Sequence, residues 1–74
     1  MRVVDVSQVP LELFKILKFE GLVGSGGEAK FAIAEGHVTV NGEVETRKRR
    51  KIVAGDVIGF ASEEFQIQLK AIPG

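Results

Sequence analysis

The segment from Ser25 to Gly42 constrains the fold more than any other part of this 74-residue chain. Ser25 and Glu28 have the spacing of a capping box, in which the Ser25 side chain caps the Glu28 amide and Glu28 reaches back to Ser25. A helix is therefore predicted to begin at this point. Gly36 is predicted to end it, because glycine most easily takes the left-handed conformation that closes a helix.

A β-hairpin is predicted directly after this helix. Val38 and Val40 alternate with other residues and share one face of a short strand. Asn41–Gly42 follows, which is the strongest two-residue signal for a hairpin turn. We expect Val44 and Thr46 on the returning strand to pair with the two valines.

A second helix and further strands surround this segment. Residues 11–20 place Leu13, Phe14, Ile16 and Leu17 on one helical face, at 100° per residue, and a glycine at position 21 ends the helix. Apolar alternation predicts strands at residues 57–60 and 65–69, with a further strand at residues 2–6. Together these patterns predict one α+β domain over residues 1–74, with a two-helix hairpin packed on one face of a small antiparallel or mixed sheet.

Composition narrows the class of protein. The hydrophobic fraction of 45% is ordinary for a globular domain, and the chain has no cysteine for disulfides or thiolate chemistry. No apolar run approaches the roughly 20 residues of a membrane span, and the N-terminal residues lack a signal-peptide pattern. We expect a monomeric cytoplasmic protein that has no membrane partner.

The charge of this chain is strongly polarised, although ten basic and ten acidic residues balance. Residues 47–51 read Arg-Lys-Arg-Arg-Lys, so the rest of the chain holds five basic and ten acidic residues, a net charge of −5. The Debye length at physiological salt is about 8 Å, so a ligand senses the local cluster rather than the total. Such a run is either a solvated loop or a surface for a phosphate backbone.

The chain lacks the side chains of a usual active site. His37 is the only histidine, and without cysteine or tyrosine the common nucleophile and base partners are missing. His37 and Glu35 are too few ligands to hold a metal ion. Residues 24–29 formally match the dinucleotide pattern G-x-G-x-x-A, but a helix rather than a strand precedes them. We therefore expect no catalysis, no metal and no cofactor.

The predicted start of the second helix offers a different kind of site. Free amides at Ser25–Gly27 can bind a phosphate oxygen, with support from the helix dipole. Alternatively, the glycines serve only the bend between the helices, and both roles are compatible. Lys15, Lys18 and Lys30 are expected on helix faces away from the core, with Lys30 unobstructed.

Two aromatic residues have no obvious place in the core. Phe19 and Phe31 fall outside the apolar stripes of their helices, whereas Phe14, Phe60 and Phe65 fit core positions. Burial of Phe19 and Phe31 against the sheet or the termini is the favoured interpretation. Base stacking is the alternative.

One pattern of positions joins the two predicted helices to the hairpin and the following turn. Its members are L-x-x-x-L (Leu13 to Leu17), Gly21, Ser25, Ala29, Ile33, Gly36, V-x-V-N-G (Val38 to Gly42) and G-D-x-I (Gly55 to Ile58). Over about residues 11–60, this pattern resembles a known family, the S-four (S4) RNA-binding domain first described in ribosomal small-subunit protein four. Two longer runs, S-G-G-E-A-K-x-x-I-A-E-G and E-T-R-K-R-x-K-I-V-A-G-D, resemble its small stand-alone bacterial version.

The resemblance implies an RNA-binding surface made by the helix hairpin and the loop beyond the first hairpin strand, directed at structured and often ribosomal RNA. The chain departs from the family pattern where Glu12, Leu13 and Phe14 replace Arg-Leu-Asp, and where Gly26 replaces an arginine. Nearby lysines and the basic run are expected to supply the missing charge. The residues expected to bind RNA are Lys15, Lys18, Ser25, Gly26, Gly27, Lys30, Asn41, Arg47, Lys48, Arg49, Arg50 and Lys51.

Three functions compete at this point. A non-enzymatic RNA-binding module that uses shape and charge is the leading hypothesis. A protein-interaction module that uses Phe19, Phe31 and an exposed strand edge is the second, and an enzyme with a small-molecule anion site is the third. A continuous positive surface that joins Lys18, Lys30 and residues 47–51 would favour the first.

Overall fold

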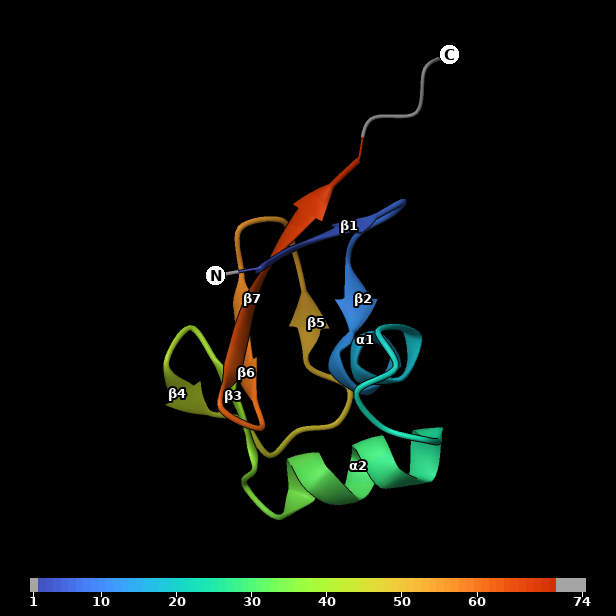
Figure 1. Ribbon diagram of the computed structural model, residues 1–74, viewed down its shortest axis with the longest axis vertical. Helices are drawn as coiled ribbons and strands as arrows, with labels where there is room; N and C mark the ends of the chain where they lie inside the picture. The colour runs from blue at the N-terminus through green and yellow to red at the C-terminus, as the bar shows by residue number, and fades with distance from the viewer. Residues whose placement is uncertain (1, 71–74) are drawn as a thin grey trace.

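The computed structural model describes residues 2–70 and shows a helix hairpin beside a mixed sheet (Figure 1). The predicted α+β architecture is therefore confirmed. The elements are β1 (Arg2–Val6), β2 (Leu11–Glu12), α1 (Leu13–Phe19), α2 (Gly26–Ala34), β3 (Val38–Val40), β4 (Glu43–Val44), β5 (Lys51–Ile52), β6 (Val57–Phe60) and β7 (Glu63–Leu69).

Five strands form the main sheet, in the order β1-β7-β6-β3-β4. Strand β1 runs parallel to β7, with Val4 opposite Ile67, and the other neighbours are antiparallel. Strands β2 and β5 form a separate two-stranded sheet that lies beside α1 (Figure 1). This small sheet brings the end of the basic run next to the first helix.

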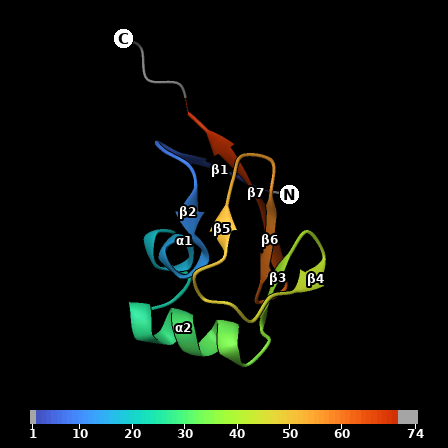
Figure 2. The same cartoon turned by 180° about the vertical axis from the view of Figure 1, so that it is seen from behind.

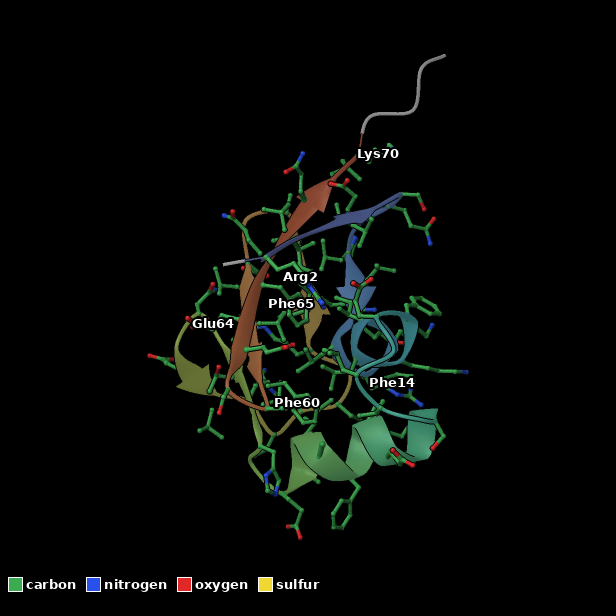
Figure 3. The ribbon with its side chains drawn as sticks, viewed as in Figure 1. Arg2, Phe14, Phe60, Glu64, Phe65 and Lys70 are labelled. Atoms are coloured by element: carbon green, nitrogen blue, oxygen red, sulfur yellow. The ribbon has the colours of Figure 1, made fainter. Side chains whose placement is uncertain are left out.

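The core lies between the helix hairpin and the main sheet. Helix α1 contributes its predicted apolar face, and Phe65 is the largest side chain that is fully buried. Phe14 and Phe60 are partly buried against this core (Figure 3). The core side chains are Val4, Leu13, Ile16, Leu17, Ala29, Ile33, Val38, Val40, Ile52, Ile58, Phe65 and Ile67.

The predicted cap of α2 forms, with one change. The Glu28 amide donates to Ser25 Oγ at 3.1 Å, as expected for a capping box. The Glu28 carboxylate, however, accepts from the amide of Gly24 at 2.9 Å instead of the amide of Ser25. Gly36 follows the helix with φ +80°, in the left-handed region that the sequence predicts.

Helix α1 begins two residues later than predicted. Leu11 and Glu12 are in strand β2, opposite Ile52 and Lys51 of β5, so the start predicted at residue 11 is wrong. This pairing depends on a segment 40 residues away in the chain, which the local helical period does not reveal.

The hairpin turn forms where the sequence predicts it, but its second strand has another register. Asn41 and Gly42 both have positive φ, which suits a two-residue hairpin turn. This turn sets Val40 opposite Glu43 and Thr39 opposite Val44. The predicted pairing of Val44 and Thr46 with the buried valines is wrong, because Val44 shares the outer face with Thr39 and is 62% exposed.

Candidate nucleic-acid interface

The loop between β4 and β5, residues 45–50, docks on the start of α1. We call it the basic loop, because it carries most of the basic run of residues 47–51. Glu12 precedes the helix without capping it through its side chain. The amides of Leu13 and Phe14 instead donate to the carbonyls of Arg50 and Lys48, at 2.9 and 3.1 Å. These bonds satisfy two amides that a helix start leaves free. The loop is therefore fixed to α1, and it passes close to α2 (Figure 2).

A buried carboxylate, Glu45, organises the side chains of this loop. It is only 6% exposed, yet its two oxygens accept from both the side chain and the amide of Arg47 and from Arg50 Nη1 at 2.7 Å. Hydrogen bonds from Arg47, and to a smaller extent from Arg50, lower the pKa of Glu45 to about 2. Glu45 is therefore charged at neutral pH and holds two of the loop's arginines.

Glu12 restrains a second pair of cations. Its carboxylate lies 3.2 Å from Lys15 Nζ and 3.9 Å from Arg49 Nε. The hydrogen bond from Lys15 lowers the pKa of Glu12. Across residues 2–70, Lys48 and Lys51 form no ion pair with a carboxylate. The basic run is thus partly neutralised, and these two lysines are its freest charges.

The two helices share a cluster of one aromatic ring and two lysines. Lys30 Nζ of α2 lies 4.8 Å from the centroid of the Phe14 ring, and Lys15 Nζ lies 6.0 Å from the same ring. Lys30 is half-buried, so the prediction that it is unobstructed is wrong. The ring of Phe14, which replaces an acidic residue of the family pattern, covers it from the neighbouring helix.

Phe19 and Phe31 are 67% and 66% exposed, so the prediction of burial is wrong. Helical geometry gives the reason. Phe19 lies two residues beyond the buried Leu17, and Phe31 lies two residues from both Ala29 and Ile33, about 200° away around the helix axis. Both rings therefore point away from the core.

The side chain of Asn41 makes two hydrogen bonds within the protein. Its Oδ1 accepts from the Val57 amide at 2.9 Å, and its Nδ2 donates to Asp56 Oδ1 at 3.1 Å. These bonds tie the β3–β4 turn to the start of β6. A role for Asn41 in RNA binding remains a prediction.

The start of α2 is open in front of Gly26. A Cβ added there would meet no heavy atom within 4 Å, and the same addition at Gly27 would meet only Ser25 Oγ at 3.8 Å. The carboxylate of Glu28, however, lies beside this helix start through its bond to Gly24. An anion at the predicted site would approach that negative charge.

A groove of about 820 Å³ separates α2 from the basic loop. Ala34 forms its wall on the helix side, and Thr46 and residues 47–51 form the other wall. The structure thus gathers the whole basic run around one hollow. Among residues 2–70 there is no group of three or more side chains that could hold a metal ion. None of the described helices is long and apolar enough to cross a membrane.

Comparison with known proteins assigns this chain to a family. The family model described as "S4 domain" matches residues 4–68. The chain belongs to the S4 domain family. The S4 resemblance of the sequence is therefore confirmed, as is the likeness to its small bacterial version. YbcJ of Escherichia coli (strain K12) is 56% identical over 57 residues, which cover 77% of this chain and 81% of YbcJ.

A solved structure and a further relative agree with this S4 assignment, and a second structure shares the fold. The solution structure of E. coli YbcJ, described as revealing a motif "involved in RNA-binding", matches with a TM-score of 0.69 and 49% identity over 92% of this chain and 87% of YbcJ. A Bacillus subtilis (strain 168) protein named "Probable ribosome maturation protein RlbA" is 39% identical over 67 residues, 86% of this chain and 89% of its own length. The 30S ribosomal protein S4e of Thermoplasma acidophilum shares the fold, with a TM-score of 0.67 at 24% identity over 81% of this chain and 32% of S4e.

Proposed function

We propose that this S4-family chain is a non-enzymatic RNA-binding module of the bacterial cytoplasm that acts as a monomer on structured RNA, with ribosomal RNA as the first candidate. The basic loop docked on α1 carries the proposal. Its backbone is held by two hydrogen bonds to Leu13 and Phe14, and Glu45 orders its arginines, so little ordering is needed on binding. The RNA-binding motif of YbcJ and the name of the B. subtilis relative support it.

The proposed surface has a central part and a peripheral part. At its centre are the basic loop and the lysines at Phe14, which contact phosphates by charge and the shallow groove of folded RNA by shape. At its edge are Lys18 and the start of α2, where the nearby Glu28 carboxylate weakens attraction for a phosphate. The proposed contact residues are those predicted from the sequence: Lys15, Lys18, Ser25, Gly26, Gly27, Lys30, Asn41, Arg47, Lys48, Arg49, Arg50 and Lys51.

The salt dependence of RNA affinity tests this proposal. If three to five phosphates are neutralised, log K falls against log salt with a slope of roughly −2 to −4.5. Lys48→Ala/Lys51→Ala removes the two charges of the basic run that form no ion pair within residues 2–70. This double substitution is expected to make the slope shallower by about 1.4 to 1.8. Lys70→Ala, at the far end of β7, is the control that should leave the slope unchanged (Figure 3). Measurable binding with a slope near zero would contradict a phosphate-dominated mode.

A second candidate, a protein-interaction module, is favoured by the exposure of Phe19, Phe31 and Val44 of the edge strand β4. The charges argue against it, since Lys15 of α1 and Lys30 of α2 both lie over the Phe14 ring instead of scattering. Crosslinking in cells with sequencing of bound RNA and identification of bound proteins separates the two functions. Recovery of a protein partner that is lost in Phe19→Ser/Phe31→Ser, with no RNA recovered, would favour the second.

A further inference from the structure

The groove between α2 and the basic loop has the chemistry of a nucleotide site. Its helix side is Ala34, and Thr46 and residues 47–51 line the rest. The stems of arginine and lysine are apolar while their ends are charged. A hollow with apolar walls and a cationic rim fits a ligand with a flat apolar part and a negative part.

Arg47 supplies a surface for the flat part. Its Nε and Nη2 donate to the two oxygens of Glu45 at 3.0 and 2.9 Å, so one edge of the guanidinium is fixed. This contact leaves the planar faces of the group unused, and the side chain is 72% exposed. A guanidinium plane held in this way is a platform on which an unstacked RNA base can stack.

The neighbouring residues supply charge for the negative part. Lys48 forms no ion pair within residues 2–70. Arg49 forms a long ion pair, with its Nε 3.9 Å from Glu12 Oε2, and 71% of its side chain is exposed. Both line the groove beside Arg47. Phosphates on either side of a base in the groove would lie within reach of these two cations.

We infer that this groove binds one unpaired nucleotide of the RNA, with its base stacked on the Arg47 guanidinium and its flanking phosphates at Lys48 and Arg49. The inference rests on the proposed function and adds to it a preference for an unpaired base over a continuous duplex. The groove is formed before binding, because backbone bonds to α1 and the Glu45 contacts hold the loop that lines it.

The test compares two RNA hairpins of equal length and charge. One carries 2-aminopurine as a single-nucleotide bulge, and the other carries it in a base pair. We expect about tenfold tighter binding to the bulged hairpin, together with quenching of the 2-aminopurine fluorescence as the base stacks. Arg47→Lys keeps the charge but removes the plane, and Ala34→Gln fills the exposed helix side of the groove. Each is expected to remove most of the preference for the bulged hairpin. Ala34→Gln, at a residue outside the proposed contact residues, should also leave affinity for the paired hairpin within about twofold.

Arg49→Lys is the matched control, since it makes the same replacement at a neighbouring arginine assigned to phosphate contact, and it should keep the preference. Equal binding of both hairpins by the unsubstituted protein would overturn the inference and leave the proposed function standing. Retention of the preference in both Arg47→Lys and Ala34→Gln would show that the base binds elsewhere. Binding of neither hairpin would contradict the proposed function as well.

Discussion

Glu45 and Arg47 are joined by three hydrogen bonds, from the amide, Nε and Nη2 of the arginine to the two oxygens of the carboxylate, at 3.0, 3.0 and 2.9 Å. The arginine therefore has both its backbone and its guanidinium fixed by a residue only two positions earlier. Glu45 holds Arg50 as well. An acidic residue beside a basic run thus has a structural reason: it gives two of the arginines a defined geometry and neutralises one positive charge.

Glu45→Gln is expected to destabilise the folded protein by about 1 kcal/mol at pH 7, since hydrogen bonds to a charged group are lost and the arginines are partly solvated. Urea unfolding of the two proteins at pH 7 measures the difference. RNA binding should also change, because the carboxylate no longer neutralises the arginines, which at the same time lose their fixed positions.

The pH dependence of this difference identifies the charge as its cause. The pKa of Glu45 is lowered from 4.5 to about 2 in the folded protein, so its contribution is fully present above about pH 4.5. It is lost as the pH falls toward 2, where the protonated carboxyl resembles glutamine. The stability gap between the unsubstituted protein and Glu45→Gln should therefore close between these pH values. A gap that stays constant down to pH 2 would show that the charge of Glu45 does not stabilise the fold.

Lys30→Ala is expected to weaken RNA binding several-fold and to lower stability by about 0.5 to 1 kcal/mol, because it removes a cation positioned over the Phe14 ring. Lys30→Gln keeps half of the aliphatic stem and removes the charge. If the charge is what matters, both variants lose the same RNA affinity in an anisotropy titration. Equal affinity of Lys30→Gln and the unsubstituted protein would remove Lys30 from the proposed surface.

Gly26→Asp tests the start of α2 separately. The site is open, and an acidic residue is favourable in the first turn of a helix, so the protein should fold with unchanged or slightly higher stability. The new carboxylate would repel a phosphate there, and we expect weaker RNA binding. Gly26→Asn has nearly the same shape without the charge and should bind more tightly than Gly26→Asp. If both bind as tightly as the parent, the glycines act only in the bend between helices.

Asn41→Ala is expected to destabilise the protein by about 2 kcal/mol, because two side-chain hydrogen bonds are lost and alanine is strained at φ +53°. Asn41→Gly loses the same bonds without the strain, so its loss should be about 1 kcal/mol. Thermal or urea unfolding separates the two contributions. RNA affinity measured on the folded variants tests the predicted binding role of Asn41, which unchanged affinity would contradict.

Local signals in the sequence were sufficient to predict the two helices and the hairpin turn. The Ser25 side-chain cap, the left-handed Gly36 and the Asn41–Gly42 turn each depend on residues within a few positions, and these three features form as predicted. The reciprocal bond of Glu28 goes to Gly24 instead of Ser25. The buried stripe of α1 follows from its period alone. The S4 family could be inferred from these same positions, because their spacing is fixed by the geometry of the helix hairpin and the turn.

Other predictions failed where the decisive partner is remote in sequence. Leu11 and Glu12 satisfy a helical pattern but pair with β5, and Lys30 is covered by a ring from the other helix. For Leu11, Glu12 and Lys30, a contact with a residue remote in sequence overrode the local pattern. Phe19 and Phe31 have apolar side chains that favour burial, but their positions around their own helix axes place them on the side away from the core.

The sequence by itself determined that five adjacent cations follow a hairpin, which was enough to predict a polyanion as the partner. Only the tertiary structure decided which of those cations are neutralised, how they are oriented and how far they are exposed. Contacts across more than thirty residues fix the carbonyls of Lys48 and Arg50 to the start of α1, and Glu12 meets Arg49 only because of that docking. Charge is a property of residue type and can be read along the chain. Its neutralisation, orientation and exposure depend on distances between residues that are separated in sequence, which folding alone sets.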